Sequence, residues 1–185
     1  EVHAEAVHRH EAPKSFIRKY IFSLDHKVIG IQYWFLALFS VFVGLTLSVF
    51  IRIHLIAPQA SIPWLDKLSP VGAPGGVITP EYYLALLTLH GTIMVFFVLT
   101  TAPQGGFGNY VLPIQIGAED MAFPRLNMLS FWTTFVGLVV IMATFFIADG
   151  PPISGWTAYP PLSAVGGASG PGQAVGQNFW IVSIA

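Results

Sequence analysis

The sequence is organised around one apolar stretch, Glu81 to Pro113, which is long enough to cross a lipid bilayer. It exceeds the ~20 residues that a spanning helix needs, and one imidazole, that of His90, interrupts it. At ~1.5 Å rise per residue, His90 lies roughly 14 Å from the acidic start of the helix, inside the hydrocarbon layer. An ionisable side chain at that depth is costly, so His90 indicates a functional site.

Two interpretations of His90 follow from its position. A neutral imidazole can ligate a metal without burying a charge, while its second nitrogen is held by a neighbouring carbonyl or hydroxyl. Gly91 follows it and removes side-chain bulk, as the approach of a flat ligand such as heme would require. The spacing alone fits equally well a histidine that hydrogen-bonds between helices and holds no metal.

The composition defines the class of protein. Hydrophobic residues make up 54% of the chain and charged residues only 9%, which is far more apolar than a soluble domain. We therefore predict an all-α integral membrane protein that folds as a transmembrane helix bundle. The chain has no cysteine, which excludes thiolate metal sites, and its net charge of −1 gives no indication of a nucleic-acid partner, so we expect none.

Hydropathy and charge divide the chain into alternating spans and loops. The basic residues Lys14, Arg18, Lys19 and Lys27 precede the first span and place the amino terminus in the cytoplasm. In chain order we predict a cytoplasmic segment 1–27, a helix 28–56, an external loop 57–80, a helix 81–112, a cytoplasmic loop 113–126, a helix 127–148, an external loop 149–176 and the start of a fourth helix 177–185.

Proline and glycine set several of these boundaries. Five prolines exclude a helix through the loop 57–80. The run GGFGN and Pro113 are expected to end the second helix. The polar tract 1–13 carries His3, His8 and His10, which could bind a metal or belong to a solvated tail, and we interpret the tract as disordered.

Four long strings carry a resemblance to a known family. They are LHGTIMVFFV, GGFGNYVLPIQIGAEDMAFPRLNMLSFW, SLDHKVIGIQYWF and GWTAYPPLS. Together they resemble subunit I of the heme–copper terminal oxidases, in particular the A-type cytochrome c oxidases. The resemblance implies that this chain is the amino-terminal portion of a subunit of about twelve helices. That subunit reduces dioxygen to water with electrons from cytochrome c and pumps protons in the respiratory chain.

The resemblance assigns cofactor roles to three residues. His90 corresponds to an axial ligand of the low-spin heme iron, where the heme is expected to be heme A. Arg52 corresponds to an arginine that contacts the heme formyl group, although a helix-end arginine is also a common membrane anchor. Trp156 corresponds to a tryptophan near the heme propionates. The family often has a glutamate of a structural cation site where this chain has His54, which puts that site in doubt.

The resemblance also implies a proton-uptake channel that begins at the cytoplasmic turn. Asp120 corresponds to its entrance, and Asn109 and Asn127 to the asparagines that line its first steps. Many family members have a second asparagine where this chain has Met128. Without the resemblance, a carboxylate in such a turn would be interpreted as a solvated charge.

The rest of the family's chemistry requires residues that this chain lacks. No second intramembrane histidine completes the low-spin site, because we place His26 before the first helix and His54 past its uncharged run. The ligands of the high-spin heme and of copper B are expected in later helices, so this portion alone would contain no catalytic residue and would be inactive. Expected partners are a copper-bearing subunit II, subunit III, cytochrome c and the lipid bilayer, in a bacterial plasma membrane.

Alternatives remain in and outside the family. Quinol-oxidising members carry Arg, Asp, His and Gln at four positions that here hold Val43, Leu47, Tyr82 and Ala85, which favours cytochrome c as the electron donor. The alternative from another class is a non-enzymatic protein, either a heme-binding membrane anchor or a transporter fragment. An anchor would need a paired histidine within these spans, and a transporter an internal repeat.

Overall fold

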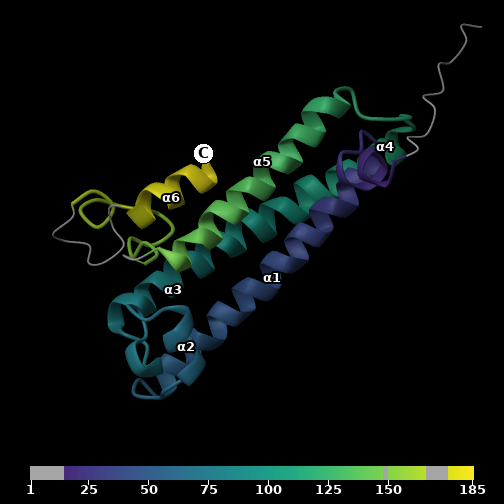
Figure 1. The fold of residues 1–185 in the computed structure, drawn as a ribbon. Helices are drawn as coiled ribbons and strands as arrows, with labels where there is room; N and C mark the ends of the chain where they lie inside the picture. The colour runs from purple at the N-terminus through teal and green to yellow at the C-terminus, as the bar shows by residue number, and fades with distance from the viewer. Residues whose placement is uncertain (1–14, 148–149, 166–174) are drawn as a thin grey trace, which may run out of the picture.

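Three long helices lie side by side in the computed structural model, which describes residues 15–147, 150–165 and 175–185 (Figure 1). They cover His26–Ile56, Pro80–Ile116 and Pro124–Phe146, and each is long and apolar enough to cross a membrane. The described residues form no β-strand, so the predicted all-α bundle is confirmed. The interpretation of residues 1–13 as disordered lies outside the described ranges.

The first helix, α1 (His26–Ile56), begins at a capped amino terminus. The carboxylate of Asp25 accepts a hydrogen bond of 2.7 Å from the main-chain N–H of Lys27, which satisfies one of the free donors of the first turn. His26 is therefore the first residue of α1, and His54 lies in its last turn. Our placement of His26 before the helix was wrong, because neither charge pattern nor hydropathy reveals the cap, whereas His54 lies within the predicted span 28–56.

The second span is one continuous helix built from three parts, α3 (Pro80–Thr92), η3 (Ile93–Phe107) and α4 (Gly108–Ile116). The predicted end at residue 112 is wrong: the helix continues through Pro113 and ends where Gly117 takes a φ of 70°. The η3 part has the wider π-helical register. There, the hydroxyls of Thr100 and Thr101 donate to carbonyls five residues earlier, and Pro103 lies within the same part of the helix.

The glycines of the GGFGN run bring two helices together instead of ending one. A Cβ built on Gly105 would lie 2.6 Å from Cδ1 of Tyr33, and one on Gly106 would lie 2.8 Å from Nε1 of Trp34. Both aromatic residues belong to α1, so the missing side chains allow α1 and η3 to approach closely. Small residues at such contacts are typical of helix packing in membranes.

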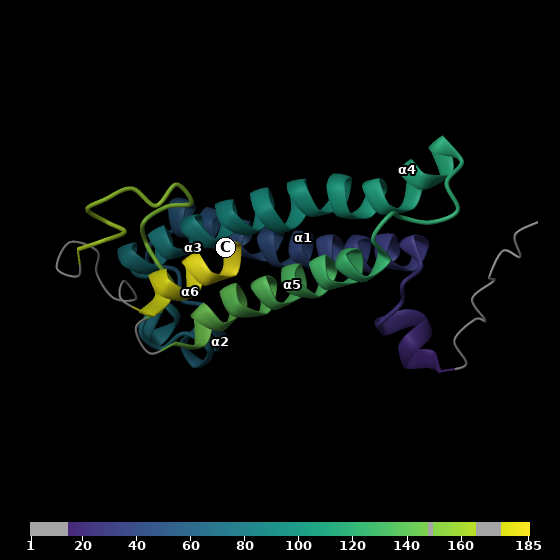
Figure 2. The same ribbon diagram turned by 90° about the horizontal axis from the view of Figure 1, so that it is seen from above.

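The third span consists of α5 (Pro124–Ala143) and a short 3₁₀ turn, η4 (Thr144–Phe146). It starts three residues earlier than predicted, because Pro124 occupies the first helical turn, where its missing N–H costs nothing. The connection from the second span is accordingly shorter than the predicted 113–126. The last helix, α6 (Val175–Ile184), lies beside the far end of α5 (Figure 2).

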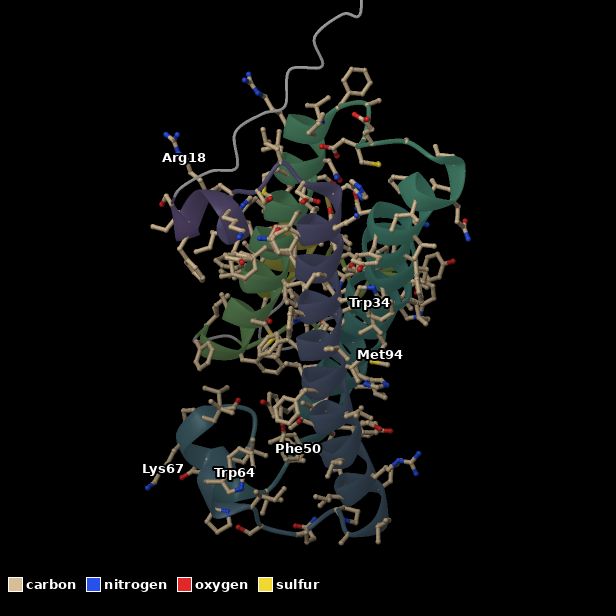
Figure 3. All side chains as sticks on the ribbon, turned by 90° about the vertical axis from the view of Figure 1, so that its right-hand side faces the viewer. Arg18, Trp34, Phe50, Trp64, Lys67 and Met94 are labelled. Atoms are coloured by element: carbon tan, nitrogen blue, oxygen red, sulfur yellow. The ribbon has the colours of Figure 1, made fainter. Side chains whose placement is uncertain are left out.

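The loop between the first two spans is folded rather than irregular. It contains a short helix, α2 (Pro63–Leu68), and a 3₁₀ turn, η2 (Pro74–Gly76), although we expected no helix there. Pro63 stands in the first turn of α2, a position that tolerates proline. The loop packs back on the spans, with the rings of Trp64 and Phe50 5.5 Å apart (Figure 3).

A short helical turn before the first span was not predicted. The segment η1 (Ile17–Ile21) folds back so that Gln32 of α1 donates to the carbonyls of Tyr20 and Ile21. The ring of Phe22 stacks on Trp132 of α5, with the centroids 5.1 Å apart. This end of the chain is therefore attached to both α1 and α5.

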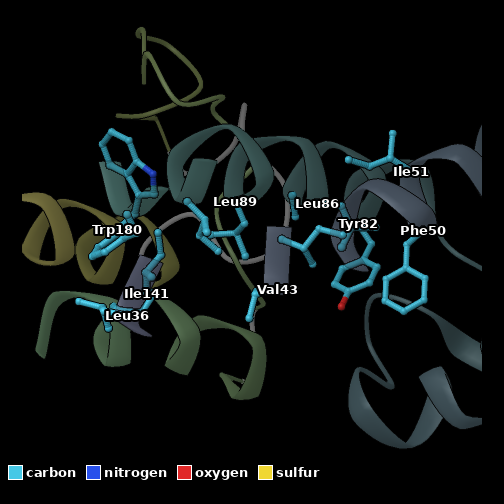
Figure 4. Close-up of a cluster of buried hydrophobic side chains, with 14 of the residues drawn as sticks. Leu36, Val43, Phe50, Ile51, Tyr82, Leu86, Leu89, Ile141 and Trp180 are labelled. Atoms are coloured by element: carbon cyan, nitrogen blue, oxygen red, sulfur yellow. The ribbon is translucent and has the colours of Figure 1, made fainter. Parts of the chain in front are cut away.

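The buried core lies where α1, α3, α5 and α6 meet (Figure 4). Leu86, Leu89 and Ile141 are fully buried, and Val43 and Trp180 pack in the same cluster. Inside a bilayer, lipid tails are as apolar as these side chains, so close van der Waals packing holds the helices together more than the hydrophobic effect does.

Candidate functional site

His90 projects from α3 toward α1 and is partly buried. Its Nδ1 lies 2.9 Å from the main-chain carbonyl oxygen of Gly44. Because a carbonyl can only accept, Nδ1 of the neutral imidazole donates the hydrogen bond, and the lone pair then resides on Nε2. This is the tautomer and orientation of a metal-ligating histidine, so the donor geometry fits an iron ligand.

Gly44 makes the contact with His90 possible. A Cβ built on Gly44 would lie 2.5 Å from Sδ of Met94 and 3.9 Å from Nδ1 of His90. No larger residue fits there without displacing Met94. The glycine therefore sets how closely α1 approaches α3 and keeps the carbonyl within reach of the imidazole.

Trp156 lies against the same part of α3. A Cβ built on Gly91 would lie 3.3 Å from Cδ1 of its indole, and the N–H of the preceding Gly155 donates a bond of 2.9 Å to the hydroxyl of Thr88. In this structure the indole of Trp156 lies against the side of α3 that Gly91 leaves without a side chain. Trp156 is 48% exposed and lies next to the helix that carries His90. Its role near the heme propionates stays a prediction.

Arg52 is exposed near the end of α1. It follows Gly44 by two turns, about 12 Å along the helix axis. It forms no ion pair with another described residue. The structure thus places Arg52 on the helix that contacts His90, beyond the contact itself, and its contact with a heme formyl group stays a prediction.

The two predicted channel asparagines do meet. Nδ2 of Asn127, in the first turn of α5, donates to Oδ1 of Asn109 in α4. Asn109 is only 5% exposed, and its Nδ2 donates a bond of 2.7 Å to the carbonyl of Gly105. Side-chain amides both donate and accept, so this pair can also bind water.

Asp120 lies in the exposed turn that joins α4 to α5. Its Oδ1 accepts a bond of 2.7 Å from the N–H of Met121, and no hydrogen bond joins it to Asn109 or Asn127 in the described structure. The carboxylate is therefore at the solvent surface, near the asparagine pair in the chain but separate from it.

Two polar pairs near the asparagines were missed from the sequence. The hydroxyl of Tyr33 donates a bond of 3.1 Å to Oγ of Ser130, one turn along α5 from Asn127. Tyr33 is buried between helices. The spacing of Asn127 and Ser130 places both on one face of α5, a signal that could have identified Ser130, whereas nothing in the sequence pairs Tyr33 with it.

The second missed residue is His26. It is buried, and its Nδ1 bonds at 2.8 Å to the main-chain carbonyl oxygen of Asn109. His26 and Asn127 therefore approach Asn109 from the first turns of α1 and α5. Together with the Tyr33–Ser130 pair, these groups place polar contacts at two levels between helices that are otherwise apolar.

No group of three or more His, Asp or Glu residues within the described ranges could hold a metal ion by itself. His90 is thus a single donor. A metal bound there would have to be carried by a prosthetic group and completed by ligands from other parts of the assembly.

Comparisons with known proteins agree with the resemblance seen in the sequence. The family model described as "Cytochrome C and Quinol oxidase polypeptide I" matches residues 28–185. The match covers α1 from its third residue, α3, α5, the loops between them and α6. Every candidate site residue except His26 lies within it.

Three curated relatives share nearly the same sequence identity with this chain. The chain is 40% identical over 160 residues to the alternative cytochrome c oxidase subunit 1 of Bradyrhizobium diazoefficiens, covering 85% of this chain and 24% of the relative. It is 39% identical to cytochrome c oxidase subunit 1 of Synechocystis and of Thermostichus vulcanus, in each case covering 89% of this chain and 26% of the relative. The chain thus spans about a quarter of the length of these relatives.

Proposed function

Because this chain belongs to the cytochrome c and quinol oxidase polypeptide I family, we propose that it forms part of the catalytic subunit of a proton-pumping cytochrome c oxidase. The complete enzyme would reduce dioxygen to water with electrons from cytochrome c. The helices described here would supply one axial heme ligand and the start of a proton path. The observation that carries the proposal is the bond from His90 to Gly44, which presents Nε2 as a metal ligand.

His90 would hold the low-spin heme, expected to be heme A, on the face of α3 toward α1. The Gly44 carbonyl accepts the proton of Nδ1 and so fixes both the ring orientation and the tautomer. A heme held there supplies one-electron transfer at a potential tuned by its ligands. Arg52 would orient the heme through its formyl group, and Trp156 would lie near the propionates.

The other end of the same helices would take up protons. Asp120 is exposed and can collect protons from water, and the Asn109–Asn127 pair offers both donors and acceptors just inside. The Tyr33–Ser130 pair, at the next level, can continue a chain of hydrogen bonds. We infer that Asp120 is the entrance of this channel.

Cytochrome c is the proposed donor rather than a quinol. Val43, Leu47, Tyr82 and Ala85, which stand where quinol-oxidising members have polar residues, are all buried in the helix core. A quinol head group would need polar partners for proton-coupled binding, and this core offers only the Tyr82 hydroxyl among the four positions.

The complete assembly would lie in a bacterial plasma membrane with the amino terminus in the cytoplasm, where the basic residues before α1 favour it. Subunit II with its copper centre, subunit III and cytochrome c are the proposed partners. The high-spin heme and copper B would be bound by other helices of the same subunit.

A direct test combines spectroscopy with turnover. Membranes that contain the complete oxidase should show low-spin heme absorption in a reduced-minus-oxidised spectrum and should consume oxygen when supplied with reduced cytochrome c. Oxygen consumption with a quinol but not with cytochrome c would favour the quinol oxidase alternative. The absence of both heme absorption and oxygen consumption would favour a non-enzymatic anchor or transporter.

A further inference from the structure

An apolar groove runs between α1 and α5, on the side of the pair where η1 is attached. It has a volume of about 390 Å³, within the ~300–1,000 Å³ range of small-molecule sites. Its walls are Gln32, Phe35, Leu36, Phe39, Phe131, Phe135 and Leu138. Gln32 is the only polar residue in this lining, so the groove can accept an extended hydrocarbon chain along most of its length.

Two buried polar atoms beside this groove have no hydrogen-bond partner among the described residues. They are Oε1 of Gln32, an acceptor, and Nε1 of Trp132, a donor. The indole ring of Trp132 packs against Phe135, with the ring centroids 5.3 Å apart, so it borders the groove wall. Both atoms are covered by neighbouring protein atoms, so they offer no hydrogen-bonding surface to the groove, whose lining stays apolar.

Positive charge lies at the same end of the groove. Nε2 of Gln32 donates to the carbonyl of Ile21 at 3.0 Å, so η1 with its Arg18 and Lys19 is fastened directly to the groove's polar residue. Figure 3 shows Arg18 at the η1 end of the molecule and Lys67 at the opposite end. Phe16 and Ile17 next to these cations are 69% and 53% exposed, as in a segment that lies at a membrane surface.

We propose that the groove between α1 and α5 binds one anionic phospholipid of the membrane leaflet at the η1 end. An acyl chain occupies the apolar groove. The phosphate is attracted by Arg18 and Lys19. An apolar chain and a negative charge occur together in a molecule such as phosphatidylglycerol.

Charge complementarity favours a lipid over a protein helix as the occupant. A spanning helix could cover the phenylalanine side chains, but apolar contact alone would leave the cations of η1 unmatched. Basic residues at a membrane surface contribute about 1 kcal/mol each toward anionic lipid. The inference does not use the heme or the proton path, so it stands or falls independently of the proposed function.

The test uses the complete membrane complex in nanodiscs of phosphatidylcholine. A minor fraction of phosphatidylglycerol carries a photoreactive group in its acyl chain, and labelled peptides are mapped by mass spectrometry. We expect labelling within 31–39 and 131–138, and weaker labelling by phosphatidylcholine with the same photoreactive chain. Arg18→Gln should lower phosphatidylglycerol labelling about fivefold, as the loss of one such charge implies, whereas the control Lys67→Gln should leave it unchanged.

A second variant tests the groove itself. Leu138→Trp fills it and should abolish labelling by both lipids, with an unchanged heme spectrum as the check on folding. If the wild-type complex shows no labelling of the two segments, protein covers the groove and the proposal is wrong. Equal labelling by the two lipids that does not respond to Arg18→Gln would show a nonspecific lipid contact, which also overturns it.

Discussion

Nδ1 of His90 and the main-chain oxygen of Gly44 are 2.9 Å apart, although 46 positions separate the two residues in the chain. This contact joins the first and second spans at a point deep within their length. It also restricts the imidazole to one tautomer, because the carbonyl can only accept. The two residues therefore need to be tested separately, one as a ligand and the other as its support.

His90→Ala should remove the low-spin heme from the complete oxidase, because the iron loses an axial ligand and no neighbouring side chain replaces it. The measurement is the reduced-minus-oxidised absorption spectrum of the purified complex. His54→Ala, in the last turn of the other helix, is the matched control and should keep the low-spin signal. An unchanged low-spin spectrum in His90→Ala would refute the ligand assignment.

Gly44→Ala should perturb the same site without removing its ligand. The added Cβ would meet Sδ of Met94 at 2.5 Å, so either Met94 or α1 must move, at a cost of about 1–3 kcal/mol for overpacking. We expect a lower thermal stability and a shifted heme reduction potential. Gly108→Ala is the control, because its Cβ would meet only a carbonyl oxygen at 3.8 Å. Identical behaviour of the two variants would show that the close approach at Gly44 is unimportant.

Asp120→Asn should slow turnover and abolish proton pumping while the heme spectrum stays normal. The substitution keeps the size of the side chain and its bond from the N–H of Met121 but removes the exchangeable proton. Oxygen consumption and proton release are measured in reconstituted vesicles. Glu119→Gln, the exposed neighbour, should behave as wild type. Wild-type pumping by Asp120→Asn would mean that Asp120 is a solvated charge.

Tyr33→Phe should slow proton uptake and cost about 0.5–1.5 kcal/mol of stability, because it removes the hydrogen bond between the buried Tyr33 and the exposed Ser130. Ser130→Ala removes the other partner. If the pair acts through its shared bond, the double variant should lose little more than either single one, in stability and in proton uptake. Fully additive losses would show that the two hydroxyls act independently.

The class of fold could be predicted from the sequence because the hydropathy and charge of each segment determine locally whether that segment spans a membrane. The three spans and the polar turn with Asp120 follow from local composition. The family resemblance implied that Asn109 and Asn127 line one channel, and the structure shows in addition that their side chains form a hydrogen bond. Physical inference from single positions was weaker, since nothing in the sequence pairs Gly91 with Trp156, the residue that lies against it.

The errors share a physical cause. Gly105, Gly106 and Pro113 are helix breakers in water, but inside a bilayer the backbone has no other donor or acceptor, so the helix continues through them. The need for glycine at positions 105 and 106 comes from Tyr33 and Trp34 on α1, whose rings leave no room for a side chain there. Likewise, the role of His26 depends on a carbonyl 83 positions away. Contacts of this kind are not visible in a local pattern.

The π-helical register of η3 affects the direction in which the second span points its side chains. Nineteen residues separate His90 from Asn109, and an ideal α-helix of that length would turn the second about 100° away from the first. Because η3 takes more residues for each turn, its length adjusts this azimuth. The same continuous helix thus directs the imidazole of His90 toward α1 and the amide of Asn109 toward α5. Deleting one residue from η3 would rotate His90 and Asn109 relative to each other about the helix axis, so that both side chains could no longer face their present partners.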